Sequence, residues 1–205
     1  NEKLIFYGQK HSSFVHGEAI PNKGEFLSVI ANGKTINTQL VGAYNLDNVL
    51  AAVCIGISFN VEISAIADAI SGYEPGNARS QKIVKGTNTI ILDAYNANPS
   101  SMSAALENFD RLAAKNKLVI IGQMNELGEY AEAEHQRIAE LVLKMDLKQR
   151  VFVGNPFAFL RNDKNILWFA TTAELNDWYK SQTFENTTQL IKGSRSNGLE
   201  VLINN

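Results

Sequence analysis

The stretch Thr89–Met102, TIILDAYNANPSSM, decides the fold of this chain. Its apolar, β-branched run over residues 89–92 predicts a buried strand, and polar residues take over at Asp93. Asn98 and Pro99 then predict the start of a helix, because Asn accepts hydrogen bonds from the first amides of a helix and Pro is preset for its first turn. In open parallel sheets, ligands bind at such a strand end, near the positive end of a helix.

Two polar residues of this stretch also have a purely structural explanation. Asn98 could serve only as a helix cap, and Asp93 could only stabilise the turn by bonding nearby amides. The unbroken string YNANP over residues 95–99, with Asp93 two residues before it, favours a binding site over these alternatives.

The composition is that of an ordinary soluble globular protein. Of the 205 residues 45% are apolar and 20% are charged, which argues against disorder. The net charge of -2 lacks the basic character that nucleic-acid binding normally requires. Cys54 is a single cysteine and is expected to be a buried small hydrophobe. No apolar run approaches a membrane span and residues 1–11 do not resemble a signal peptide, so we expect a cytoplasmic protein.

Residues 1–80 indicate an α+β segment with a thin core. A strand is expected at residues 4–7, a hairpin of residues 26–30 and 35–40 around Asn32-Gly33, and two helices whose apolar faces span residues 49–57 and 63–70. His11 and His16 fall in a polar loop and receive no role. We interpret this part as the remainder of a larger domain, followed by a linker at residues 72–80.

From Gln81 onward, strands alternate with helices. This pattern predicts an α/β, Rossmann-like, mostly parallel sheet with helices on both faces. The expected strands are residues 89–92, 118–121, 151–153, 167–170 and 189–191, and the expected helices start near Pro99, Ala131 and Thr172.

Two further strands run into polar turns, residues 122–128 and 192–196. In a parallel sheet all such turns emerge along one edge, so they could line one cleft. The turn Lys192-Gly-Ser-Arg offers two cations and a hydroxyl, a combination suited to phosphate or carboxylate, although a solvated loop would explain it equally well. Asn45 and Asn48, one helical turn apart, suit an adenine edge, with helix capping as the alternative.

Four stretches together resemble the signatures of the Mur ligase family: GAYNLDNVLAA (42–52), LDAYNANPSSM (92–102), IGQMNELGEYAEAEH (121–135) and KGSRSNGLE (192–200). The chain departs from the usual family pattern at Tyr44, Leu92 and Gln123. The resemblance implies an enzyme of three domains, of which residues 1–80 are the C-terminal part of the central ATP-binding domain and residues 81–205 the C-terminal Rossmann-like domain.

The resemblance also implies an activity. It is the ATP-dependent joining of D-alanyl-D-alanine to UDP-N-acetylmuramoyl-tripeptide through an acyl phosphate, in peptidoglycan precursor synthesis. ATP and Mg²⁺ are the implied cofactors, with the Mg²⁺ ligands upstream of this chain. The family's phosphate loop, G-x-x-G-K-[ST], does not occur in the sequence. We therefore expect a fragment without ligase turnover of its own, monomeric, with no nucleic-acid or membrane partner.

Site residues follow from the resemblance, position by position. ATP would bridge the two domains and favour their closure, since its expected contacts lie on both sides of the linker. No residue is assigned to catalysis or to a metal, and His135 is expected at the edge of the core. The implied roles are adenine binding by Asn45 and Asn48; phosphate and ribose binding by Arg79 and Asp93; contact where nucleotide and dipeptide meet by Tyr95, Asn96 and Asn98; binding of the dipeptide carboxylate by Lys192, Ser194 and Arg195; and binding of its ammonium by Glu126.

Two other functions compete with this one. A non-catalytic, nucleotide-binding Rossmann-like module would share the sheet, although no G-x-G-x-x-G follows its first strand. A sister ligase of the same family with another amino-acid substrate would share the mechanism. The strings YNANP and KGSR favour the D-alanyl-D-alanine-adding type.

Overall fold

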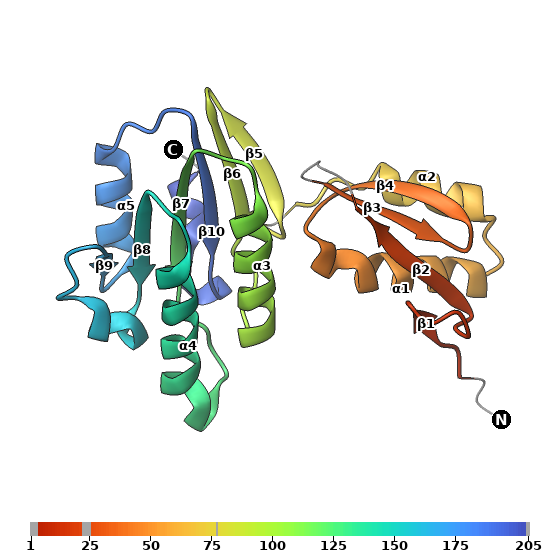
Figure 1. Cartoon of the computed structure of the whole chain (residues 1–205), viewed down its shortest axis with the longest axis horizontal. Helices are drawn as coiled ribbons and strands as arrows, with labels where there is room; N and C mark the ends of the chain where they lie inside the picture. Colours follow the sequence, from red (N-terminus) through yellow and green to blue (C-terminus); the bar gives the residue numbers. More distant parts are fainter. Residues whose placement is uncertain (1–3, 22–25, 77, 204–205) are drawn as a thin grey trace. The chain divides into compact units, whose positions relative to one another are not determined.

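The computed structural model describes residues 4–21, 26–76 and 78–203, and the chain divides into two compact units, Asn1–Pro75 and Gly76–Asn205 (Figure 1). The boundary falls inside the linker predicted at residues 72–80. Each unit has its own sheet and its own helices. Among the described residues, no helix is long and apolar enough to cross a membrane.

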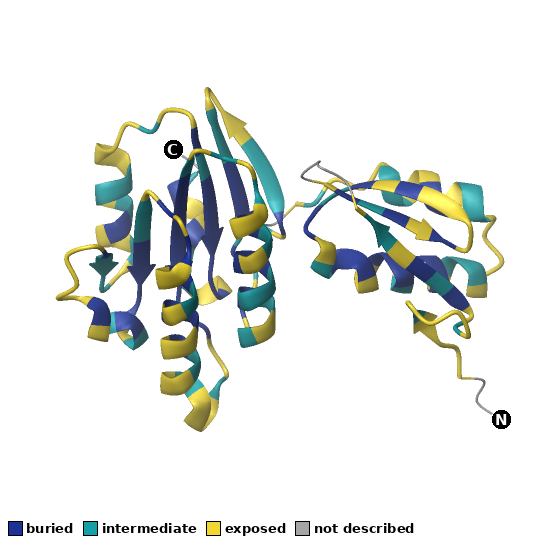
Figure 2. Ribbon diagram, in the orientation of Figure 1, coloured by how far each residue is buried: buried dark blue, intermediate teal, exposed yellow. Residues whose placement is uncertain are grey.

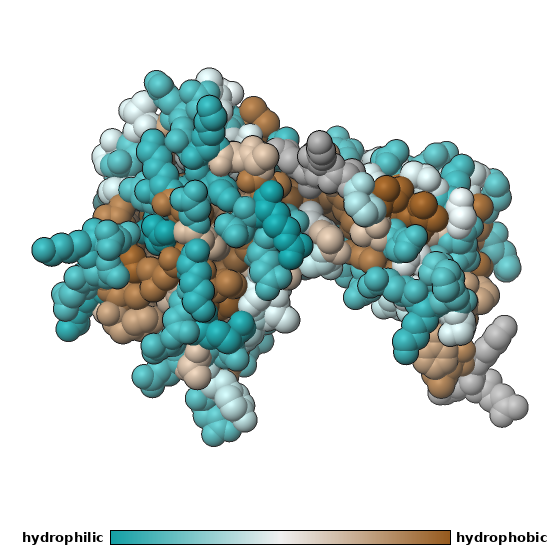
Figure 3. Space-filling view, in the orientation of Figure 1, coloured by the Kyte–Doolittle hydropathy of each residue, from teal (hydrophilic) through white to brown (hydrophobic). Residues whose placement is uncertain are grey.

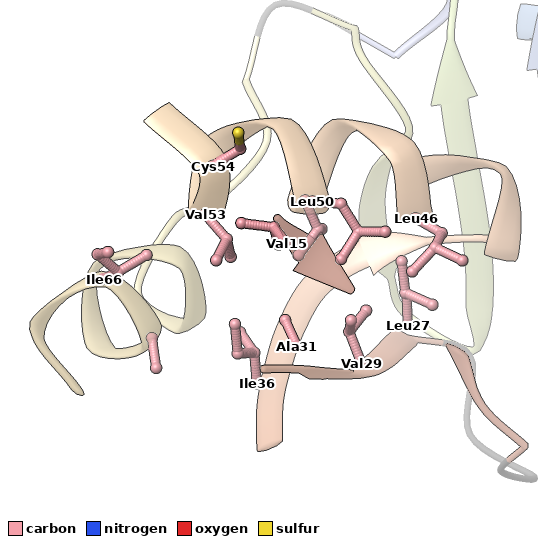
Figure 4. Packing of buried hydrophobic residues seen from close by; sticks show 12 residues of the cluster. Val15, Leu27, Val29, Ala31, Ile36, Leu46, Leu50, Val53, Cys54 and Ile66 are labelled. Atoms are coloured by element: carbon pink, nitrogen blue, oxygen red, sulfur yellow. The ribbon is translucent and has the colours of Figure 1, made fainter. Parts of the chain in front are cut away.

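The first unit is a four-stranded sheet packed against two helices. Its strands β1 (Tyr7–Gly8), β2 (Val15–Ile20), β3 (Phe26–Ala31) and β4 (Lys34–Val41) are ordered β1-β2-β3-β4, with only the β1–β2 pair parallel. Helices α1 (Leu46–Ser58) and α2 (Ile63–Ser71) follow. Figure 4 shows their apolar side chains, Leu50, Val53 and Ile66 among them, facing those of the strands, with Cys54 buried as predicted.

The predicted hairpin is confirmed, because Asn32 and Gly33 adopt positive φ angles of 45° and 78° between β3 and β4. Two other predictions for this unit need correction. The strand predicted at residues 4–7 holds only at Tyr7, where β1 begins, and His16 lies in strand β2 rather than in a loop. Strand β2 escaped prediction because Gly17 takes an inward position, where a Cβ atom would lie 2.4 Å from Leu50.

The second unit is a six-stranded sheet in the order β5-β6-β10-β7-β8-β9. Strands β6 (Asn88–Asp93), β10 (Thr187–Lys192), β7 (Asn116–Gly122), β8 (Gln149–Val153) and β9 (Leu167–Phe169) are parallel, and β5 (Gln81–Lys85) is an antiparallel edge strand. All five predicted strands are present, whereas β5 was not predicted. Its sequence QKIVK is short and largely polar, which hides it from a search for apolar runs.

Helices cover both faces of this sheet, as predicted. Helices α3 (Pro99–Arg111) and α4 (Ala131–Lys144) lie side by side on one face in Figure 1. Helix α5 (Thr172–Ser181) packs on the other, where Leu175 joins a core cluster with Ile90, Leu92 and Ile120. Figure 2 shows the central strands buried, and Figure 3 shows mostly hydrophilic residues on the visible face of each unit. Since the parallel strands are covered on both faces, their loops at the strand ends are the free surface.

Candidate ligand site at the carboxyl edge of the second sheet

Three neighbouring strands of the second unit, β6, β10 and β7, end at the same edge. Their register pairs Lys192 with Asp93 on one side and with Ile121 on the other, so the three polar turns that follow begin side by side. The expectation that these turns emerge along one edge is confirmed. Figure 1 shows β10 running between β6 and β7.

Asp93, the last residue of β6, has both carboxylate oxygens engaged. Lys192 Nζ lies 2.5 Å from Oδ2, and the Ser80 amide donates to Oδ1 at 3.0 Å. Lys192 is only 1% exposed. The resemblance implied that Lys192 binds the carboxylate of a dipeptide; the structure instead pairs its ammonium with Asp93 inside the protein.

The segment before β5 is fastened to the end of β6. The Ala78 carbonyl accepts hydrogen bonds from the amides of Ala94 (2.8 Å) and Tyr95 (3.1 Å). The Arg79 guanidinium carbon lies 3.6 Å from the centroid of the Tyr95 ring, a cation–π contact. Arg79, Asp93 and Tyr95 are therefore brought together, as expected.

Arg195, from the turn after β10, approaches the same ring, with its guanidinium carbon 5.0 Å from the centroid. The hydrogen bond and charge of Arg79, and then the charge of Arg195, lower the pKa of the Tyr95 phenol below its usual 10.0, because both cations favour the tyrosinate. Two guanidinium groups beside one exposed turn create a local positive potential suited to phosphate or carboxylate.

Ser194 joins three loops through its hydroxyl. Its Oγ accepts a hydrogen bond from the Asn125 amide at 3.0 Å and donates to the Ala97 carbonyl at 3.5 Å. Ser194 is 2% exposed, so its hydroxyl holds the turns after β6, β7 and β10 together.

The two asparagines of the YNANP string are exposed, and each makes local hydrogen bonds. Asn98 caps α3, with Oδ1 accepting from the Ser101 amide at 2.8 Å in a capping box, so the helix cap predicted at Asn98 is confirmed. Asn96 Oδ1 accepts from the Ala97 amide at 2.8 Å. Glu126 is exposed on the loop after β7, where it adopts a left-handed φ of 62°.

His135 belongs to the core, as the sequence indicated. Its Nε2 accepts a hydrogen bond from the Met124 amide at 2.9 Å, and its Nδ1 donates to the Ala131 carbonyl at 2.6 Å. This arrangement requires the neutral ring protonated on Nδ1. Burial lowers the pKa of His135 below its usual 6.5. The residue therefore supports the loop after β7.

Asn45 and Asn48 belong to the first unit and form a linked pair at the start of α1. Asn45 is buried; its Nδ2 donates to the Val41 carbonyl at 2.9 Å and its Oδ1 accepts from Asn48 Nδ2 at 3.1 Å. Asn48 is the exposed member of the pair.

The sequence did not indicate two further features of the second unit. A cavity of about 550 Å³ borders Tyr95 and Arg195, with Glu200 also at its wall and Leu92 and Ile83 among its apolar lining. Asn197 bonds the loops after β7 and β10 to each other through its side chain. In the part of the chain that the structure describes, no group of three His, Cys, Asp or Glu residues is placed to hold a metal ion.

Comparison with known proteins identifies the family. The family model described as "Mur ligase, glutamate ligase domain" matches residues 78–195, more than half of the chain. The chain belongs to the Mur ligase family.

Several Mur ligases of one type are similar to this chain. A curated relative from Treponema pallidum, named UDP-N-acetylmuramoyl-tripeptide--D-alanyl-D-alanine ligase, is 32% identical over 183 residues, which are 85% of this chain and 39% of the relative. A protein of the same name from Borreliella burgdorferi is 22% identical over 100% of this chain and 45% of its own length. The chain thus spans less than half the length of these relatives.

Solved structures of these ligases share the fold. The UDP-N-acetylmuramoylalanyl-D-glutamyl-2,6-diaminopimelate--D-alanyl-D-alanyl ligase from Acinetobacter baumannii superposes with a TM-score of 0.83 at 23% identity, covering 98% of this chain and 45% of that one. The MurF ligase from Thermotoga maritima in complex with ADP superposes with a TM-score of 0.77 at 19% identity, covering 98% of this chain and 47% of that one. The Rossmann-like fold expected from the sequence is confirmed.

Proposed function

We propose that this chain is part of an ATP-dependent ligase that joins D-alanyl-D-alanine to UDP-N-acetylmuramoyl-tripeptide in peptidoglycan precursor synthesis. The proposal rests chiefly on one observation: Arg79, Tyr95 and Arg195 converge at the carboxyl edge of a Mur ligase domain. The names of the relatives from Treponema pallidum and Borreliella burgdorferi support the substrates, and the ADP complex of the Thermotoga maritima ligase supports the nucleotide. Because the reaction consumes ATP, we place the protein in the cytoplasm, where ATP is available.

The chemistry proceeds in two steps. A carboxylate is a poor electrophile, so the γ-phosphate of ATP is first transferred to the tripeptide carboxylate, which gives an acyl phosphate and ADP. The dipeptide amine then attacks the acyl carbon, and phosphate leaves from the tetrahedral intermediate. Catalysis depends on neutralising phosphoryl charge and on placing the amine beside the acyl carbon, and it needs no covalent enzyme nucleophile.

Within this scheme Arg79 and Arg195 supply positive charge, one toward the phosphate and the other toward the dipeptide carboxylate. Asp93 would bind the ribose with the oxygen lone pairs that Lys192 and Ser80 leave free. The exposed residues Asn96 and Glu126 would contact the dipeptide, and Asn48, backed by Asn45, the adenine. Mg²⁺ ligands are not assigned to this chain.

The proposal is tested by titrating the purified chain calorimetrically with D-alanyl-D-alanine and, separately, with ADP. We expect saturable binding of both, and a dipeptide Kd weakened by about tenfold to a hundredfold in Arg195→Ala, since a lost charge-assisted hydrogen bond costs about 1.5–3 kcal/mol. Arg161→Ala, at an exposed arginine outside the site, is the matched control and should bind like the parent chain. Binding that is equally weak in both variants would contradict the role of Arg195.

We further propose that the chain alone does not turn over, because its sequence contains no G-x-x-G-K-[ST] loop for the ATP phosphates. The purified chain, ATP, Mg²⁺, UDP-N-acetylmuramoyl-tripeptide and D-alanyl-D-alanine are combined, and phosphate release is followed. No release above the rate without dipeptide is the expected result. Dipeptide-dependent release would contradict this second proposal and leave the first intact.

A further inference from the structure

Asn197 links the loops that follow β7 and β10, and no function described so far uses it. Its Oδ1 accepts a hydrogen bond from the Gln123 amide at 3.1 Å. Its Nδ2 donates to the Gln123 carbonyl at 3.0 Å and to the Ser194 carbonyl at 2.7 Å. One carboxamide therefore bonds both backbone groups of Gln123 and, at the same time, the turn after β10.

This side chain reinforces the sheet beyond its last strand pair. The ladder between β7 and β10 has Lys192 opposite Ile121, and the Ser194 amide then donates to the Gln123 carbonyl at 3.1 Å. Asn197 adds a second donor to that carbonyl and the acceptor for the Gln123 amide. Two glycines leave room for it. A Cβ atom on Gly122 would lie 2.9 Å from Asn197 Cγ, and one on Gly193 would lie 2.9 Å from Gly122 Cα.

The turn that Asn197 closes carries two residues of the candidate site. The Asn197 amide donates to the Ser194 carbonyl at 2.9 Å, so residues 194–197 form one tight turn with Arg195 inside it. Arg195 reaches the Tyr95 ring from this turn, and Ser194 Oγ meets the Asn125 amide. Where Arg195 presents its guanidinium thus depends on how the turn is held against Gln123.

We propose that Asn197 is a positioning residue of the ligand site, whose carboxamide holds Arg195 beside Tyr95 and Ser194 against the loop after β7. The identity of the ligand rests on the proposed function, whereas the placement of Arg195 does not. An aspartate at this position would present an oxygen to the Ser194 and Gln123 carbonyls, which repel it, although its shape matches that of asparagine.

The test reads the position of Arg195 through Tyr95, without any ligand. The Tyr95 phenol is titrated by NMR in the parent chain and in the Asn197→Ala, Asn197→Asp and Arg195→Ala variants. Arg195→Ala gives the full effect of losing that cation, a rise in the pKa of Tyr95. We expect Asn197→Ala to move the pKa of Tyr95 in the same direction. The control variant Asn165→Ala, in an exposed loop, should leave the pKa of Tyr95 unchanged.

Two more measurements separate positioning from folding and from the proposed function. Amide exchange at Gln123 should rise about tenfold in Asn197→Ala, which lacks the oxygen that accepts from this amide; that is the factor expected for about one lost hydrogen bond. Calorimetry should give a Kd for D-alanyl-D-alanine that is about tenfold weaker in Asn197→Ala than in the parent chain.

Faster exchange of the Gln123 amide with an unchanged Tyr95 titration would overturn the proposal and leave Asn197 a merely structural residue. If the parent chain does not bind the dipeptide, the proposed function fails, while the Tyr95 titration still decides the role of Asn197. If Asn197→Ala does not fold, Asn197→Ser replaces it in the Tyr95 titration, because it also lacks the carboxamide and adds no charge beside the phenol.

Discussion

At the scale of single residues, the ion pair of Lys192 and Asp93 is the most consequential contact of the site, because it lies inside the protein. Removing one partner of a buried pair leaves the other charge uncompensated, which typically costs about 3–5 kcal/mol. We expect Lys192→Met to lower the free energy of unfolding by about that amount, measured by urea denaturation. Lys164→Met, at an exposed lysine, should change it little.

The double variant Lys192→Met with Asp93→Asn completes this experiment. It removes both charges but keeps an oxygen that accepts from the Ser80 amide. If the cost of Lys192→Met comes from an unpaired carboxylate, the double variant should be more stable than that single variant. A double variant less stable than Lys192→Met would mean that packing around Lys192, rather than its charge, explains the loss.

His135 makes the stability of the second unit depend on pH. Its pKa is lowered in the folded protein, so the unfolded chain takes up a proton near pH 6.5 while the folded one stays neutral. The stability that the neutral His135 ring contributes is therefore fully present above pH 6.5, and it is lost as the pH falls below that value toward the pKa of the folded protein. We expect the urea midpoint to fall between pH 7 and pH 5, and His135→Gln to reduce this dependence. A His16→Gln control should keep the dependence; an equal reduction in both variants would contradict the assignment.

At the scale of elements, the capping boxes of α3 and α5 provide a matched pair. Asn98 and Thr171 each accept from the amide three residues on, but only Asn98 was implied to bind substrate. Asn98→Ala and Thr171→Ala should each cost about 0.5–2 kcal/mol of stability. Asn98→Asp keeps the acceptor and should restore stability. Dipeptide affinity then separates the two roles, because a cap alone predicts parent-like binding by Asn98→Asp, measured by calorimetry.

Element prediction succeeded wherever the hydrophobic pattern was strong. Strands β6, β7 and β8 contain continuous apolar runs that are buried, and Pro99, Ala131 and Thr172 each begin a helix as expected. It failed at β2 and β5, in which glycine and polar residues interrupt the apolar pattern. The local hydrophobic pattern does not reveal a strand that is held in the sheet mainly by the elements packed around it.

The candidate site was predictable at the level of loops but not of contacts. Strand ends located the polar turns, and the structure brings Arg79, Tyr95 and Arg195 together. The pairing of Lys192 with Asp93 could not be foreseen, because it depends on β10 lying next to β6, 99 residues away along the chain. Asn197 lies inside the KGSRSNGLE stretch but received no role, since both of its bonds to Gln123 come from another loop and no local spacing marks them.

At the scale of the whole molecule, the chain consists of two units that each have their own core, joined by a segment without regular structure at residues 73–76. Tyr73 is 53% exposed in that segment. Proteases cut exposed, irregular backbone first, so brief chymotrypsin treatment should cleave after Tyr73 and leave a resistant piece of residues 74–205, identified by mass spectrometry. Tyr73→Ser should slow this cut, whereas Tyr130→Ser, at an exposed tyrosine in a short helix, should not.

The resistant piece decides whether the second unit folds by itself. Its sheet has five parallel strands covered by helices on both faces, and its core cluster draws only on residues from Ala78 to Ile203. Since the apolar surface that stabilises it is buried within the unit, the piece should unfold cooperatively and keep its secondary structure by circular dichroism. It should also retain the Tyr95 titration of the intact chain, because Arg79 and Arg195 both lie within it. Rapid degradation past residue 76 would mean that this unit needs the first one to stay folded, and the ligand site would then have to be studied only in the intact chain.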